Sequence, residues 1–150
     1  MGNDRKIKMK KIPKILLNRI KTPDGTILTS THVHDYVTHE DKVSKEHYMV
    51  DGGREYLRRS VNIVPYEEQS VDTSSHFVII RQTFTWGTYG KNMEHPLKFV
   101  KLCNMSNEHI TAILSTQDFS VKKGNKWVQN ILRKELKFRD KNNIKIEDFI

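Results

Sequence analysis

Three histidines and an aspartate fall within eight residues of one another: His32, His34, Asp35 and His39. Imidazole and carboxylate groups together are suitable ligands for zinc or another divalent ion. On a β-strand, His32 and His34 would point to the same face, because side chains alternate between the two faces. The chain contains no H-E-x-x-H motif, and histidines on a strand can also bond across the sheet. We therefore expect these residues to bind a ligand, without a bound metal or cofactor.

Two aspartates and two arginines form a second candidate group: Asp35, Asp51, Arg58 and Arg59. An arginine fork holds a carboxylate or a phosphate through two parallel hydrogen bonds. If the four side chains share one hollow, they would bind a nucleotide-like ligand or an RNA phosphate. The alternative is that Asp51 caps a following helix and that one arginine pairs with Asp35 or Glu55.

A third candidate group surrounds two glycines, with Trp86, Tyr89 and Lys91 beside Gly87 and Gly90. Aromatic side chains next to basic ones on a loop can stack nucleic-acid bases. The alternative is that the tryptophan closes the core beneath a turn. The loop matches neither a P-loop nor a dinucleotide-binding fingerprint. No Ser-His-Asp order or Cys-His pair marks a nucleophile.

The formal net charge of +8 is concentrated at the two ends of the 150-residue chain. Residues 1–21 contain eight Lys or Arg and one acidic residue, and residues 121–150 contain nine and four. Basic ends raise the encounter rate with polyanions, and salt screens that effect. A nucleic acid, another polyanion or an acidic host protein is therefore the expected partner, and a solvated tail is the alternative. The candidate nucleic-acid arm comprises Arg5, Lys6, Lys8, Lys10, Lys11 and Lys14.

Length and composition favour one domain with a basic arm. A chain of this size can bury a full core, and its single cysteine, Cys103, cannot form an internal disulfide. No run reaches the roughly 20 apolar residues of a membrane span. We expect a cytoplasmic protein with no membrane partner. The predicted organisation is a basic arm at 1–17, a single α+β domain at 18–140 and a tail at 141–150.

The elements that would position the candidate groups begin with a β-hairpin over 18–30. Its turn is Pro23-Asp24-Gly25, in which proline presets φ, aspartate bonds the nearby backbone and glycine accepts a positive φ. Strands are predicted at 33–39 and 47–50, followed by a short helix at 54–60. Residues 61–75 are predicted to be irregular.

The second half predicts helices around one strand. Residues 75–86 fit either a helix or a strand, and a helix is favoured because Ser74 or Ser75 can cap it. A loop is predicted at 87–92 and a strand at 96–102. Ser106 precedes a predicted helix at 107–115, and an apolar stripe predicts the last helix at 125–139. The fold class is therefore α+β, with a small antiparallel sheet packed by C-terminal helices.

Several strings in the chain resemble a family of small proteins from tailed bacteriophages: TPDGT (22–26), HVHDYVTH (32–39), YMVDGG (48–53), YLRRS (56–60), WGTYGK (86–91) and MSNEHITAIL (105–114). The first half is also similar to small bacterial zinc modules. Those modules carry cysteine pairs where this chain has residues 22–25 and 38–39, so the resemblance leads us to expect the hairpin turn in place of a structural zinc. The resemblance implies a phage protein acting in the host bacterial cytosol, and it implies no catalytic role.

The leading functional hypothesis is a non-enzymatic, phage-encoded accessory protein for host takeover. It would engage an anionic host component such as RNA, DNA or a nucleotide signal. One alternative is a metal-dependent phosphoesterase or nuclease that uses the His/Asp cluster. Another is a protein–protein inhibitor of a host defence or transcription factor.

Overall fold

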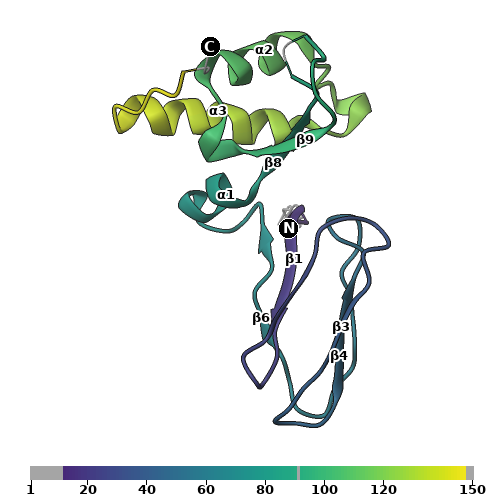
Figure 1. The fold of residues 1–150 in the computed structure, drawn as a ribbon. Coiled ribbons are helices and arrows are strands. Elements are labelled where there is room, and N and C mark those ends of the chain that lie inside the picture. The colour runs from purple at the N-terminus through teal and green to yellow at the C-terminus, as the bar shows by residue number, and fades with distance from the viewer. Residues whose placement is uncertain (1–11, 91, 148–150) are drawn as a thin grey trace, which may run out of the picture. The chain divides into compact units, whose positions relative to one another are not determined.

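The computed structural model of the chain describes residues 12–90 and 92–147 (Figure 1). The chain forms two compact units, 1–75 and 76–150, where the sequence predicted one domain over 18–140. Antiparallel strands and α-helices together confirm the predicted α+β class. All the α-helices of the described residues belong to the second unit, and most of the strands belong to the first.

Strand β1 (Ile15–Lys21) is the centre of the first unit. Its residues alternate between inside and outside, so that Leu16, Asn18 and Ile20 are buried. It begins within the segment expected to be a basic arm. Three strands pair antiparallel with β1: β2 (Ile27–Ser30), β6 (Glu67–Glu68) and β7 (Val71–Asp72). Strands β6 and β7 lie within residues 61–75, which were predicted to be irregular. Each has only two residues and exists because it pairs with β1, so the local sequence gives no signal for it.

The hairpin predicted over 18–30 is confirmed. Asn18 lies opposite Ser30 in the β1–β2 register. At the turn, Gly25 has a φ of 91° and donates its N–H to the carbonyl oxygen of Thr22 at 2.9 Å. The local chemistry of Pro23-Asp24-Gly25 therefore determines this turn.

A second antiparallel sheet completes the first unit. It joins three strands in chain order: β3 (Val37–Glu40), β4 (His47–Asp51) and β5 (Arg58–Arg59). Strand β4 confirms the strand predicted at 47–50. The core of this unit draws on both sheets and contains Ile20, Leu28, Tyr48 and Val50, with Val37 and Tyr66 packed against them.

The strand predicted at 33–39 begins only at Val37. The preceding residues form a turn, in which His34 has a φ of 68°. The N–H of Asp35 donates to the carbonyl oxygen of His32 at 3.0 Å. Because these residues leave the extended conformation, the alternation that would align His32 with His34 is lost.

The short helix predicted at 54–60 is wrong. Gly52 and Gly53 have φ values of 94° and 51°, and they reverse the chain after β4. Arg58 then lies opposite Asp51 in the β4–β5 register. Asp51 therefore ends a strand and caps no helix.

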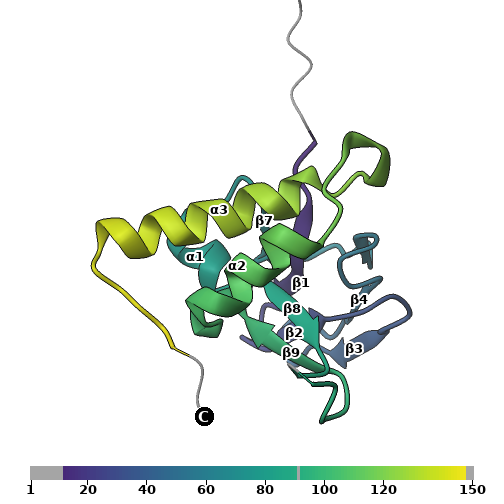
Figure 2. The same ribbon diagram turned by 90° about the horizontal axis from the view of Figure 1, so that it is seen from above.

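The second unit contains a two-stranded antiparallel sheet, α-helices and short 3-10 turns. Its elements follow in chain order: α1 (Phe77–Thr83), β8 (Thr85–Thr88), β9 (Lys98–Lys101), η1 (Leu102–Asn104), α2 (Asn107–Thr116), η2 (Val121–Lys123) and α3 (Lys126–Lys141). Helices α2 and α3 lie side by side in both views (Figures 1 and 2). The core of this unit includes Ile80, Phe84, Leu102, Met105, Ile110, Ile113, Val128, Ile131 and Leu132.

The helix predicted at 75–86 is confirmed in part. It covers Phe77–Thr83, and His76 is its N-cap, without a side-chain capping bond. The chain then becomes extended at Phe84 and continues as β8, which occupies the start of the predicted loop. The segment predicted as one helix is therefore divided, with a helix at Phe77–Thr83 and a strand at Thr85–Thr88.

Helices α2 and α3 confirm the predictions from capping and apolar periodicity. The Ser106 hydroxyl accepts the N–H of His109 at 3.0 Å, which satisfies a free donor in the first turn. Beyond α3, the described part of the predicted tail returns to the start of α2, where the carbonyl oxygen of Ile146 accepts the N–H of Asn107 at 2.8 Å. Among the described residues, no helix has the length and apolar character needed to cross a membrane.

Candidate functional site

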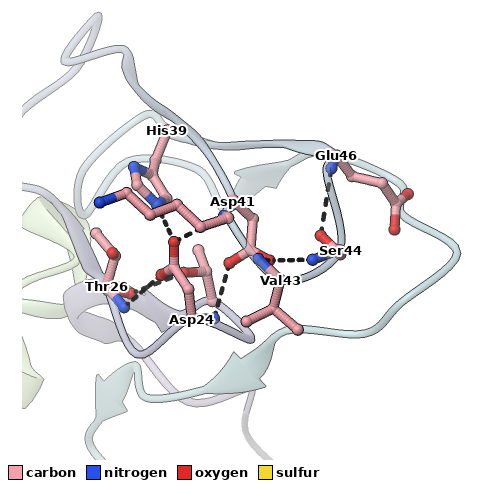
Figure 3. A network of polar contacts seen from close by, with 9 residues as sticks. Asp24, Thr26, His39, Asp41, Val43, Ser44 and Glu46 are labelled. Carbon is pink, nitrogen blue, oxygen red and sulfur yellow. Dashed lines mark hydrogen bonds and ion pairs between the residues drawn. The ribbon is translucent and has the colours of Figure 1, made fainter.

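Asp24 lies at the centre of a polar network in the first unit (Figure 3). Its Oδ1 accepts the Thr22 hydroxyl at 2.8 Å and the Thr26 N–H at 3.0 Å. Its Oδ2 lies 2.7 Å from His39 Nε2 and accepts the Lys42 N–H at 3.0 Å. The carboxylate therefore joins the β1–β2 turn to the end of β3.

Asp41 lies fully buried beside this carboxylate. Its Oδ1 accepts the Asp24 N–H at 2.8 Å, and its Oδ2 accepts the N–H groups of Val43 and Ser44 at 3.1 and 2.6 Å. These bonds form the turn that follows β3 (Figure 3). Each aspartate thus stabilises the turn to which it belongs. Each also accepts a backbone N–H from the other turn, Asp24 from Lys42 and Asp41 from Asp24.

Hydrogen bonds keep both carboxylates ionised. The Lys42 N–H, with smaller effects from Thr26 and His39, lowers the pKa of Asp24 far below its ordinary value of 3.8. Burial raises the pKa of Asp41, but the N–H groups of Ser44 and Asp24 outweigh it, so this pKa also lies below 3.8. The network is therefore held by charge-assisted hydrogen bonds.

One imidazole and two carboxylates come together here in a set that could hold a divalent ion. The ligand atoms of Asp24, His39 and Asp41 lie within 4.8 Å of one another. However, all four carboxylate oxygens already accept hydrogen bonds, and His39 Nε2 faces an Asp24 oxygen directly. These contacts fit a structural tie between two turns better than a metal centre.

The histidines predicted to act together are separated. His32 has a side chain that is 70% exposed, and His34 is also exposed, whereas His39 joins the network. Asp35 accepts the N–H of Thr31 at 2.8 Å, which is the main cause of its lowered pKa. Asp35 thus shapes the turn before β3 and is not brought together with His39.

Arg59 is bound within the first unit. Its Nε donates to Asn18 Oδ1 at 3.0 Å, its two terminal nitrogens lie 2.6 and 3.0 Å from the Glu68 oxygens, and Nη2 also donates to Ser70 Oγ at 2.5 Å. The guanidinium also lies 5.7 Å from the centre of the Tyr66 ring. Only 8% of its side chain is exposed. The fork predicted to bind a ligand therefore connects β5 to β1 and β6.

Arg58 and Asp51 lie across the same pair of strands. Arg58 Nη1 lies 3.6 Å from Asp51 Oδ2, and 65% of the Arg58 side chain is exposed. Asp51 is buried, and its Oδ1 accepts the N–H of Gly52 at 2.8 Å. Two of the four residues in this predicted group are therefore structural, Asp35 supports a turn, and Arg58 reaches solvent.

The loop group predicted in the second half is divided between a strand and a turn. Trp86 is half-buried within β8, and Tyr89 beyond it is 46% exposed. Lys91 lies outside the described residues. So does most of the predicted basic arm (Arg5, Lys6, Lys8, Lys10 and Lys11), whereas Lys14 is exposed and donates its N–H to Thr73 Oγ1.

A basic face on α3 was missed as a site. Exposed basic side chains occur at the start of the helix, at Lys126, and over its C-terminal half, at Arg133, Lys134, Lys137 and Lys141. At 3.6 residues per turn they fall within an arc of about 100°. Their spacing, opposite the apolar stripe, is the signal that would have identified this face.

The acidic residues of α3 explain why this face is strongly positive. The helix contains Glu135 and Asp140, and Glu135 is fully buried. Arg81 Nε and Arg139 Nε donate to its two oxygens at 2.7 and 2.8 Å. Asp140 is therefore the one acidic side chain of α3 that remains exposed beside the five basic ones.

Comparison with protein-family models, curated proteins and solved structures gives no match for this chain. Function is therefore inferred from the chemistry of its own residues.

Proposed function

We propose that this protein is a non-enzymatic nucleic-acid-binding protein, an accessory factor encoded by a bacteriophage and acting on RNA or DNA in the host cell. The exposed basic face of α3 is the observation that carries the proposal. The phage setting rests on the sequence resemblance alone.

The spread of charge along α3 favours a polymeric anion over a small one. A helix of 16 residues is about 24 Å long. Its exposed basic residues run from Lys126 to Lys141 at its two ends. A nucleotide signal would contact one part of this face, whereas a nucleic-acid backbone presents phosphates along its whole length.

The residues that the sequence assigned to a small-molecule pocket also favour a polymeric anion as the ligand, because their side chains are already bonded within the protein. Hydrogen bonds to other residues of the same chain hold Arg59, Asp35 and His39. The exposed cations of α3 form no ion pair with any other described residue, whereas Lys145 beyond the helix lies 3.4 Å from Glu147. A solvated face that only maintains solubility is the competing explanation.

Fluorescence anisotropy with labelled RNA and DNA oligonucleotides across a salt series tests the proposal. We expect binding that weakens steeply with salt, because phosphate contacts release counterions. Lys134→Gln with Lys137→Gln should reduce the magnitude of the log–log salt slope by about 1.4 for single strands. Lys42→Gln with Lys45→Gln is the matched control, because both residues are exposed in a turn of the other unit. No binding by the wild-type chain at low salt would overturn the proposal.

The two alternative functions stay predictions with their own tests. Elemental analysis of protein purified without a tag tests the metal-dependent phosphoesterase or nuclease. A pull-down from host lysate, with and without nuclease treatment, tests the protein–protein inhibitor.

A further inference from the structure

The β8–β9 sheet of the second unit exposes apolar side chains on one face. In its register, Gly87 lies opposite Phe99 and Thr85 lies opposite Lys101. Residues directly opposite in an antiparallel pair share a face, and so do residues two apart on one strand. Gly87, Phe99 and Lys101 therefore belong to the same face.

Phe99 is unusually open for its type. The residue is 60% exposed, whereas Phe84 and Phe119 of the same unit are 2% and 7% exposed. Leu97 and Tyr89, where the loop between the two strands ends and begins, are 49% and 46% exposed. A single exposed apolar residue needs no explanation, but three neighbouring ones form a patch of the kind that marks a binding surface.

Gly87 gives this face its shape. A Cβ at this position would lie 3.1 Å from Leu97 Cδ1 and 3.2 Å from Phe99 Cε1. Both side chains therefore lean from their own part of the chain across the glycine. The absence of a side chain at position 87 lets the phenyl ring lie over the β8 backbone while most of its surface stays open.

Positive charge accompanies the apolar patch. Lys101, two residues beyond Phe99 on β9, is exposed and belongs to the same face, whereas the exposed Lys98 belongs to the opposite one. A purely apolar protein segment would gain nothing from this cation. A ligand with flat apolar surfaces joined by negative charges uses both features, and unpaired nucleotides have that chemistry.

We propose that the β8–β9 face is a stacking platform for unpaired bases, with Phe99 as its principal ring and Lys101 as a phosphate contact. The inference rests on the proposed nucleic-acid function and narrows it to single strands, because the bases of a duplex are stacked within it. It also replaces Trp86 with Phe99 as the aromatic contact. Tyr89 of the predicted loop group extends the platform.

Two probes with equal numbers of phosphates separate this inference from the proposed function. The first is a thymidine 12-mer, and the second is an abasic 12-mer of the same backbone. The basic face of α3 meets the same phosphates in both, whereas a stacking platform requires the bases. We expect the full-length protein to bind the thymidine strand about tenfold more tightly, the effect of one stacked base.

Substitutions at the ring complete the test. Phe99→Leu keeps an apolar side chain and should remove most of the preference for the thymidine strand, leaving abasic binding and the salt slope unchanged. Phe99→Tyr keeps the ring and should retain the preference, with thermal unfolding as the check on folding. Equal binding of the two probes by the wild type, or a Phe99→Leu chain that keeps the preference, overturns the platform and leaves the proposed function standing. Binding of neither probe overturns the platform, and the salt series with RNA and DNA then decides the proposed function.

Discussion

Arg81 binds Glu135 through two parallel hydrogen bonds between side chains 54 positions apart in the sequence. Nε donates to Oε1 at 2.7 Å and Nη2 donates to Oε2 at 3.0 Å. Glu135 is fully buried, and Arg139 adds a third bond at 2.8 Å. The pair raises the pKa of the Arg81 guanidinium, chiefly through these hydrogen bonds. This network connects α1 to the inner side of α3.

Glu135→Ala should destabilise the second unit by about 3–5 kcal/mol, because it leaves the buried Arg139 and the largely buried Arg81 without their shared carboxylate. Urea unfolding followed by tryptophan fluorescence measures the change, since Trp86 and Trp127 both lie in this unit. Glu108→Ala is the control, because this exposed residue of α2 should contribute less than about 1 kcal/mol through the helix dipole. Equal losses in the two variants would contradict a special role for the buried pair.

Asp24→Asn should destabilise the first unit at neutral pH and flatten its acid dependence. The folded pKa of Asp24 is depressed, so its stabilisation is complete above the ordinary value of 3.8 and is lost as the pH falls below it. Hydrogen exchange of the amide of Val50, a core residue of the first unit, reports the stability of this unit and is measured from pH 7 downward. Glu67→Gln is the control, because Glu67 is exposed on β6. An unchanged acid limb in Asp24→Asn would show that the network does not hold the two turns.

Arg59→Lys should raise the pKa of Glu68 from about 2 toward its ordinary 4.5. Hydrogen bonds from the guanidinium are the main cause of the low value, and an ammonium cannot reproduce the planar fork. Because the folded pKa is depressed, this stabilisation is complete above pH 4.5 and disappears as the pH falls toward 2. Carboxyl NMR titration measures it. Arg58→Lys should leave the Glu68 titration unchanged, and a shift there would contradict the assignment to Arg59.

Gly53→Ala should destabilise the first unit more than Gly25→Ala. Both residues have positive φ values, 51° and 91°, and alanine in such a conformation costs about 1–2 kcal/mol. A Cβ at Gly53 would also lie 2.5 Å from the backbone nitrogen of His32, whereas one at Gly25 would meet nothing within 4 Å. Unfolding followed by circular dichroism compares the two variants. Equal losses of stability in the two variants would mean that the backbone at His32 shifts at little cost to accommodate the added Cβ.

Local chemistry explains which elements the sequence could predict. The turn at Pro23-Asp24-Gly25 and the cap at Ser106 depend on residues within a few positions, and α3 depends on a repeating apolar stripe. The failed helix at 54–60 is a different case. Strand β5 exists because β4 offers it a partner, and no pattern within two residues can indicate such pairing.

The candidate site shows the same limit. His39 was identified, but its partners Asp24 and Asp41 belong to turns that appeared only structural, and Asp24 lies 15 positions away. The arginine pair was identified as a binding fork, but the sequence could not show that Glu68 would be delivered to Arg59 by β6. The exposed face of α3 was readable from spacing, because helical period alone places its basic residues together.

The pairing of β1 with β7 has a consequence for synthesis of the chain. Strand β1 is synthesised before β7, and Val71 and Asp72 must leave the ribosome before they can pair with Leu17 and Ile15. While most of the first unit is being translated, the edge of β1 that will pair with β7 therefore has no partner strand. Premature termination before residue 71 would release a fragment with that edge open, and such a fragment should be a target for chaperones or proteases.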